Sequence, residues 1–199
     1  MKRYILCLML TSFCMVNVAG QSHRRRSGST SRTGVMTDIR KVDFKNFTYE
    51  VQGERVTLRN GEYKLDWYLD RDFQTNRYRF VYGDLTGDGK EEAVVVLANN
   101  VAGAANAVLQ YGFIFTIRNA QVFKLAEFKG GDGSCSMEGA ECSLLSVRVE
   151  AGLLIVDRAV PTANDASCCP LMYRSTKYRW DGSRLVEIGK TGLSRIRNN

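Results

Sequence analysis

The sequence predicts an all-β fold: a single antiparallel domain, arranged as a meander or a sandwich, with at most short helices. Two observations carry this prediction. Apolar and polar residues alternate with a period of two in short runs, as expected of strands that bury one face. Pairs rich in Gly, Asn and Asp separate these runs at hairpin distances, so consecutive strands are expected to pair with one another.

The alternating runs are 47–51, 54–59, 78–82, 110–118, 121–129, 144–150, 153–158, 173–180 and 184–188. Residues 92–98 (EAVVVLA) are almost entirely apolar, which predicts a central strand covered on both faces. Residues 38–46 and 99–107 are expected to form short helices or loops. Trp67, Trp180 and most Tyr and Phe residues are interpreted as core residues or cross-strand pairs, in preference to a platform for stacking sugars.

The chain begins with the pattern of a secretory signal peptide. Lys2 and Arg3 precede an apolar run over residues 4–18, and the small residues Ala19 and Gly20 follow it. Residues 1–20 are therefore expected to be a signal that is cleaved near Gly20. The run is shorter than the roughly 20 residues that span a bilayer, and no other segment comes close, so we expect no transmembrane span after signal removal. The predicted location is secreted or periplasmic.

Residues 21–36 are predicted to be a disordered basic linker, because residues 21–34 contain no apolar side chain, four Arg and four Ser. The all-β domain is expected over 37–190, followed by a basic tail at 191–199. The whole chain carries a net charge of +7, but residues 35–189 hold 19 basic and 21 acidic residues. The basic character therefore belongs to the two ends of the chain, and nucleic acid is not an expected partner.

Four cysteines remain after signal removal, namely Cys135, Cys142, Cys168 and Cys169. An even number in an exported chain predicts disulfide bonds, and three pairings are open. The preferred pairing joins Cys168 and Cys169 separately to Cys135 and Cys142. A bond between the two adjacent cysteines is the alternative. A zinc site is disfavoured because the usual Cys-x-x-Cys spacing is absent.

One loop, residues 84–92, has the composition of a cation site. Asp84, Thr86, Asp88 and Glu92 place oxygen-bearing side chains at its positions one, three, five and nine, and Lys90 would contribute its main-chain carbonyl. Calcium prefers six to eight such oxygen ligands, so the loop is a candidate calcium site. The alternative is a plain hairpin turn, since turns are rich in Asp and Gly.

The same segment, DLTGDGKEE, resembles the strand-flanked calcium loops of FG-GAP and VCBS repeats. It departs from them at two positions: Thr86 stands where those loops usually have Asn or Asp, and Glu92 stands where they have Asp. The resemblance implies an ion with a structural role and a dissociation constant on the order of 10⁻⁴–10⁻³ M. The Cys-Cys-Pro sequence at 168–170 and the segment 178–182 are similar to those of small exported bacterial proteins of unknown function. This likeness favours a bacterial envelope protein.

His23 is the only histidine and lies in the linker, so a Ser-His-Asp triad and a Cys-His dyad are excluded. We therefore expect a non-enzymatic binding module whose partner is an envelope protein or polymer, contacted by loops 99–107, 130–142 and 161–170. One alternative is a small envelope hydrolase that uses the carboxylates of Asp84, Asp88 or Glu92. Another is an inhibitor of a secreted hydrolase such as lysozyme.

Overall fold

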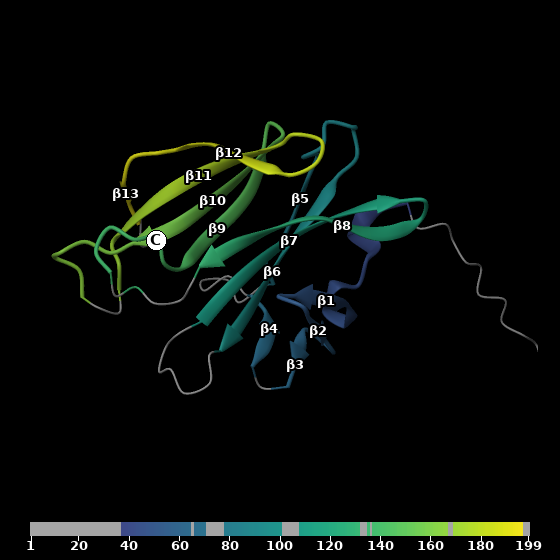
Figure 1. The fold of residues 1–199 in the computed structure, drawn as a ribbon, viewed down its shortest axis with the longest axis horizontal. Helices are drawn as coiled ribbons and strands as arrows, with labels where there is room; N and C mark the ends of the chain where they lie inside the picture. Colours follow the sequence, from purple (N-terminus) through teal and green to yellow (C-terminus); the bar gives the residue numbers. More distant parts are fainter. Residues whose placement is uncertain are drawn as a thin grey trace, which may run out of the picture. The chain divides into compact units, whose positions relative to one another are not determined.

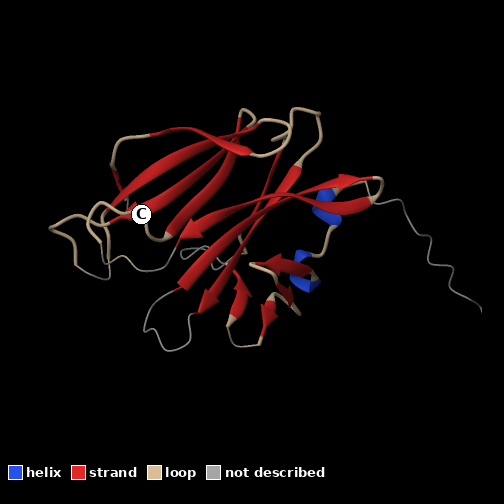
Figure 2. Cartoon of the chain, in the orientation of Figure 1, coloured by secondary structure: helices blue, strands red, loops and turns tan. Residues whose placement is uncertain are grey.

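The computed structural model describes residues 37–64, 66–70, 78–100, 108–131, 135, 137–166 and 169–196. It confirms the predicted all-β fold, because nearly all regular structure in these residues is antiparallel strand (Figures 1 and 2). The helices of the described part are two 3₁₀ turns, η1 (Ile39–Lys41) and η2 (Phe44–Asn46), which lie inside the segment where a short helix was expected. None of the described helices has the length and apolar character needed to cross a membrane.

The strands of the described residues form one hairpin and two larger sheets. Their bounds are β1 (Thr48–Val51), β2 (Glu54–Thr57), β3 (Glu62–Tyr63), β4 (Trp67–Leu69), β5 (Phe80–Gly83), β6 (Glu92–Asn100), β7 (Val108–Arg118), β8 (Gln121–Gly131), β9 (Leu144–Glu150), β10 (Leu153–Val160), β11 (Met172–Trp180), β12 (Leu185–Lys190) and β13 (Ser194–Arg195). Strands β1 and β2 pair with each other. The first large sheet has the order β3-β4-β6-β7-β8, with β5 also paired to β6. The second has the order β12-β11-β10-β9, with β13 paired to β11.

Strand β6 is the buried centre of the first sheet, as the apolar run predicted. Its residues alternate between two cores: Val95 and Leu97 join one hydrophobic cluster, whereas Val94 and Val96 join the other. Each of these four side chains is at most 1% exposed. A strand covered on both faces carries apolar residues without alternation, which explains the continuous run.

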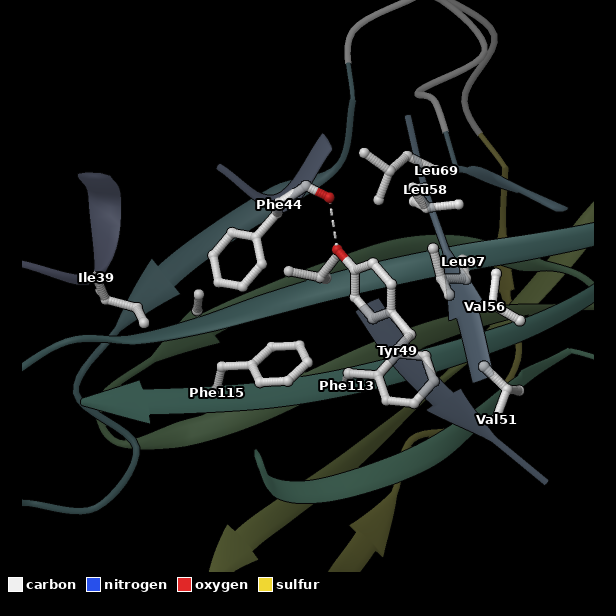
Figure 3. Packing of buried hydrophobic residues seen from close by; sticks show 12 residues of the cluster. Ile39, Phe44, Tyr49, Val51, Val56, Leu58, Leu69, Leu97, Phe113 and Phe115 are labelled. Atoms are coloured by element: carbon white, nitrogen blue, oxygen red, sulfur yellow. Dashed lines mark hydrogen bonds between the residues drawn. The ribbon is translucent and has the colours of Figure 1, made fainter. Parts of the chain in front are cut away.

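The first core is rich in aromatic residues and lies between the first sheet and the β1-β2 hairpin with its preceding turns (Figure 3). Turn η2 brings Phe44 to within 5.3 Å of Phe115, measured between ring centroids. The buried hydroxyl of Tyr49 donates a 2.7 Å hydrogen bond to the carbonyl of Phe44, which satisfies both polar groups inside the core.

The second core joins the two large sheets into a sandwich. Ile114 and Val94 of the first sheet pack with Leu154, Val156 and Leu144 of the second. Consecutive strands pair along β6-β7-β8 and along β9-β10-β11-β12, so each sheet contains an antiparallel meander. The predicted single antiparallel architecture therefore takes the sandwich form.

Buried polar side chains also connect the sheets. Arg158 on β10 is 7% exposed and donates hydrogen bonds to the carbonyls of Gly130 (2.7 Å) and Lys129 (2.5 Å) on β8. Gln110 on β7 accepts a 2.7 Å hydrogen bond from the main-chain N–H of Leu144 on β9. These contacts satisfy main-chain groups at strand ends, where a neighbouring strand is missing.

Strand β13 lies within residues 191–199, the range expected to be a tail, and it pairs with β11. The signal and linker predictions for residues 1–36 fall outside the described residues. So do residues 101–107 of the loop expected at 99–107, whose first two residues, Asn99 and Asn100, belong to strand β6 and not to a helix or loop. Parts of loops 130–142 and 161–170 also lie outside the described residues.

Candidate functional site

The candidate site begins at Glu92, the first residue of β6, whose side chain is completely buried. Its carboxylate accepts hydrogen bonds from the main-chain N–H groups of Leu85 (2.8 Å) and Thr86 (3.1 Å). It also accepts from the hydroxyls of Thr116 (3.0 Å) and Thr86 (3.5 Å). Burial raises the pKa of Glu92, and the hydrogen bonds from Leu85, Thr116 and Thr86 oppose that shift. Glu92 thus anchors the loop between β5 and β6 to strand β7.

The other loop carboxylates cap main-chain N–H groups within the same loop. Asp84 accepts from the N–H of Gly87 (2.7 Å) and of Gly89 (2.9 Å), and Asp88 accepts from the N–H of Lys90 (2.9 Å). Gly87 and Gly89 have φ angles of 77° and 81°, in the left-handed region that favours glycine. The acidic and glycine residues therefore build a tight, internally hydrogen-bonded turn.

Next to this turn, Glu91 points toward the N-terminal part of the domain. Its carboxylate forms a bidentate ion pair with the guanidinium of Arg40 on η1, with N–O distances of 2.5 and 2.7 Å. The hydrogen bond from Arg40 lowers the pKa of Glu91. Glu91 is thus occupied by an ion pair, while its neighbour Glu92 is held inside the protein.

All five residues of the predicted calcium site, namely Asp84, Thr86, Asp88, Lys90 and Glu92, lie in this one loop. The carboxylates of Asp84, Asp88 and Glu92 each accept hydrogen bonds from protein donors, as described above. Within the described residues, no group of three or more His, Cys, Asp or Glu side chains is arranged to hold a metal ion. Calcium binding by this loop stays a prediction.

A hollow of about 490 Å³ lies beside the loop and is lined by three separate segments. The loop contributes Thr86, Asp88 and Lys90; β7 and the turn after it contribute Thr116, Ile117, Arg118 and Asn119; the end of β11 contributes Trp180. Since β7 belongs to the first sheet and β11 to the second, the site exists only because the two sheets pack together. We call it the Trp180 hollow.

Trp180 is half-buried and lies opposite Leu185 on β12. It belongs to neither hydrophobic core, so of the two expected roles, core residue or cross-strand pair, it has the second. Trp67, in contrast, packs against the first core and lies 5.7 Å from the ring of Tyr111, as expected. The indole of Trp180 forms part of the wall of the hollow.

Arg118 is held at the edge of the hollow by an aromatic neighbour. Its guanidinium lies over the ring of Phe123, 5.0 Å from the centroid. Phe123 is 50% exposed, which is unusual for a side chain of this size. The hairpin turn between β7 and β8 uses positive φ angles at Asn119 (51°) and Ala120 (61°), and it brings Arg118 and Asn119 to the hollow.

The sequence singled out the loop residues of the hollow but not Arg118, Asn119 or Trp180. Arg118 and Asn119 form only the turn between two predicted strands, and Trp180 was interpreted as a core residue or a cross-strand pair. Nothing in a one-dimensional pattern indicates that the ends of β7 and β11 meet. The missing information is the packing of one sheet on the other.

The cysteines pair differently from the preferred prediction. Cys135 and Cys142 form a disulfide with each other, with Cα atoms 5.1 Å apart. The predicted bridges from these two residues to Cys168 and Cys169 are therefore wrong. A loop with a sequence separation of seven brings its own ends together, so a local bond forms without a partner from the second loop. Cys169 is also disulfide-bonded, and Cys168 lies outside the described residues.

A second hollow, also of about 490 Å³, lies over β7 and β8 and is lined mainly by apolar residues, among them Val51, Leu109, Tyr111 and Phe113. It contains fewer hydrogen-bonding side chains than the Trp180 hollow.

Comparison of the chain with protein-family models, with curated proteins and with solved structures found no match.

Proposed function

We propose that this protein is a secreted or periplasmic, non-enzymatic binding module of the cell envelope, and that the Trp180 hollow is its ligand site. The observation that carries the proposal is the convergence of three segments around one half-buried indole that serves neither core. Ligand sites are typically concave and combine apolar surface with a few polar groups that orient the ligand. The Trp180 hollow has this combination.

A binding role is favoured over a hydrolytic one by the orientation of the acids. Glu92 has no exposed surface, and the carboxylate of Asp84 accepts from main-chain N–H groups on both of its oxygens. A two-carboxylate hydrolase needs both groups to reach the substrate or a water beside it. Of the three acids considered for catalysis, only Asp88 lines the hollow.

The test of this proposal is sedimentation of the oxidised protein with an isolated envelope fraction. The parent protein is expected to sediment with the fraction, and Trp180→Ala is expected to lose at least tenfold in affinity. Met137→Ala is the matched control, because Met137 is a large side chain that is 68% exposed and lies in the disulfide loop, away from the residues that line the hollow. If Met137→Ala abolishes binding and Trp180→Ala does not, the disulfide loop is the contact surface and the proposal fails.

Calcium at residues 84–92 is part of the proposal as a structural ion that stiffens one wall of the hollow. Thermal unfolding with millimolar calcium and with chelator tests this part. A midpoint that rises with calcium in the parent protein but not in Asp88→Ala is the expected result. An identical midpoint under all conditions would mean that the hydrogen-bonded turn holds the wall by itself.

A further inference from the structure

We infer that the ligand of the Trp180 hollow is a saccharide that carries a negatively charged group, such as a carboxylate, sulfate or phosphate. The inference rests on the proposed function and adds the chemical class of the ligand. It combines three features of the hollow: its aromatic wall, the direction of its hydroxyl groups and its unbalanced charge.

The aromatic wall offers a surface that suits a sugar ring. The indole of Trp180 lines the hollow, and Phe123 is exposed on the face of the β7-β8 hairpin that also carries Thr116, its cross-strand partner. One face of a pyranose ring consists of C–H groups, which pack on an aromatic ring as other apolar groups do. The hydroxyls of the sugar project from its edge and need hydrogen-bonding partners there.

The hydroxyls of the hollow are oriented by the buried acid beneath them. Thr116 and Thr86 both line the hollow, and both donate their hydroxyl protons to Glu92. Because the proton of the half-buried Thr86 is committed inward, the remaining lone pairs of its oxygen are available as acceptors, whereas Thr116 is 5% exposed and serves to hold Glu92. Sugar hydroxyls can donate to such acceptors, and the side chain of Asn119 adds both a donor and an acceptor.

The charge of the lining favours an anion. Lys90 and Arg118 supply two positive charges and Asp88 supplies one negative charge, so the lining carries a formal charge of +1. Neither Lys90 nor Arg118 forms an ion pair with any described residue. The nearby acid Glu91 is paired with Arg40. The carboxylates of Asp84 and Glu92 do not line the hollow and accept hydrogen bonds from main-chain N–H groups of the loop. An anionic group on the ligand would supply the missing partner for these cations.

The experiment is calorimetric titration of the oxidised protein with matched oligosaccharides. Trigalacturonate and a sulfated chondroitin disaccharide are the acidic probes, and maltotriose and chitotriose are the neutral ones. At low salt, at least one acidic probe is expected to bind at least tenfold more tightly than both neutral probes. Arg118→Gln and Lys90→Gln are each expected to reduce this preference, whereas Trp180→Ala weakens binding of every saccharide.

The variants need two controls. Met137→Ala should bind as the parent does, and circular dichroism should show that each variant retains the fold. Equal affinity for acidic and neutral probes would overturn the assignment of a charged saccharide. Absence of saccharide binding at millimolar concentration would overturn it as well, and the proposed function would still stand if Trp180→Ala had lost binding to the envelope fraction. If Trp180→Ala binds that fraction as the parent does, the proposed function itself falls.

Discussion

Replacing Glu92 by Ala is expected to lower the free energy of unfolding by about 3–5 kcal/mol. The change removes the acceptor for the N–H groups of Leu85 and Thr86 and for the hydroxyl of Thr116. Leu85 is only 4% exposed, so its N–H group has no access to water as a substitute partner. A buried donor without an acceptor costs about 1–3 kcal/mol. The buried N–H group of Leu85, the half-buried N–H group of Thr86 and the void left by the side chain together give the stated range.

Glu92→Gln is the control that separates hydrogen bonding from charge. Its amide oxygen can accept from the N–H groups of Leu85 and Thr86, and its amide nitrogen can donate to the hydroxyl of Thr116, which rotates to accept. Hydrogen bonds to the neutral amide of the variant are weaker than those to the carboxylate of the parent, but the variant no longer buries a charge. We therefore expect its stability at pH 7 to lie within about 1 kcal/mol of the parent.

The raised pKa of Glu92 gives this pair of variants a pH signature. The folded protein holds the proton of Glu92 more tightly than the unfolded chain does, so this residue's contribution to stability is fully present below the ordinary value of 4.5. It is lost as the pH rises through the higher pKa of the folded state. Glu92→Gln does not titrate, so its stability relative to the parent should improve as the pH rises through this window.

The assay is urea unfolding of the parent, Glu92→Ala and Glu92→Gln at several pH values above 4. Thermal unfolding is the second readout. Each kcal/mol corresponds to about 2–4 °C in the thermal midpoint of a domain of this size, so the midpoint of Glu92→Ala should lie roughly 10 °C below that of the parent. A Glu92→Ala protein within about 1 kcal/mol of the parent at pH 7 would refute the anchoring role of this residue.

Three further predictions concern the framework. Gly131→Ala should lower the free energy of unfolding by about 2 kcal/mol or more, because the new Cβ would lie 2.1 Å from the main-chain oxygen of Cys142. Gly192→Ala is the control, since a Cβ there would have nothing within 4 Å. Equal urea midpoints for the two variants would contradict the clash. Replacing both Cys135 and Cys142 by Ala should cost about 2–3 kcal/mol in urea unfolding, and a peptide map that shows no Cys135–Cys142 bond would contradict this pairing. Hydrogen bonds in the β11-β12 turn lower the pKa of Asp181 to about 2, so its carboxylate stabilises the fold at pH values above the ordinary pKa of 3.8, and this stabilisation is lost as the pH falls through about 2. The loss of stability caused by Asp181→Asn should therefore shrink in acid. A loss of stability that does not depend on pH would contradict this role.

The strands were predictable because their signal is local. Strands β9, β11 and β12 have one face that is more exposed, so apolar and polar residues alternate along them, whereas β7 and β10 are largely buried on both faces and appear as mainly apolar runs between turn signals. The very short strands β3 and β4 escaped, since two or three residues are too few to show a period. Strand β13 escaped for the same reason, as it has only two residues.

The candidate site was predictable only in part. The loop from Asp84 to Glu92 was visible because its acids and glycines form a local pattern. The contribution of Trp180 depends on how the second sheet packs against the first, a long-range property that no local pattern encodes. The same limit explains the disulfide, since cysteine spacing alone did not distinguish the local Cys135–Cys142 bond from a bond between loops.

The most direct measurement of ligand binding at the Trp180 hollow is a nitrogen-edited NMR spectrum of the two tryptophan indole N–H groups. The chain contains only Trp67 and Trp180, so each indole gives one assignable signal, and Trp67 on the first core serves as an internal control. Addition of a soluble acidic saccharide digest of the envelope is predicted to shift the signal of Trp180 and to leave that of Trp67 in place. A shift of Trp67 alone, or of neither signal, would contradict the assignment of this hollow as the ligand site.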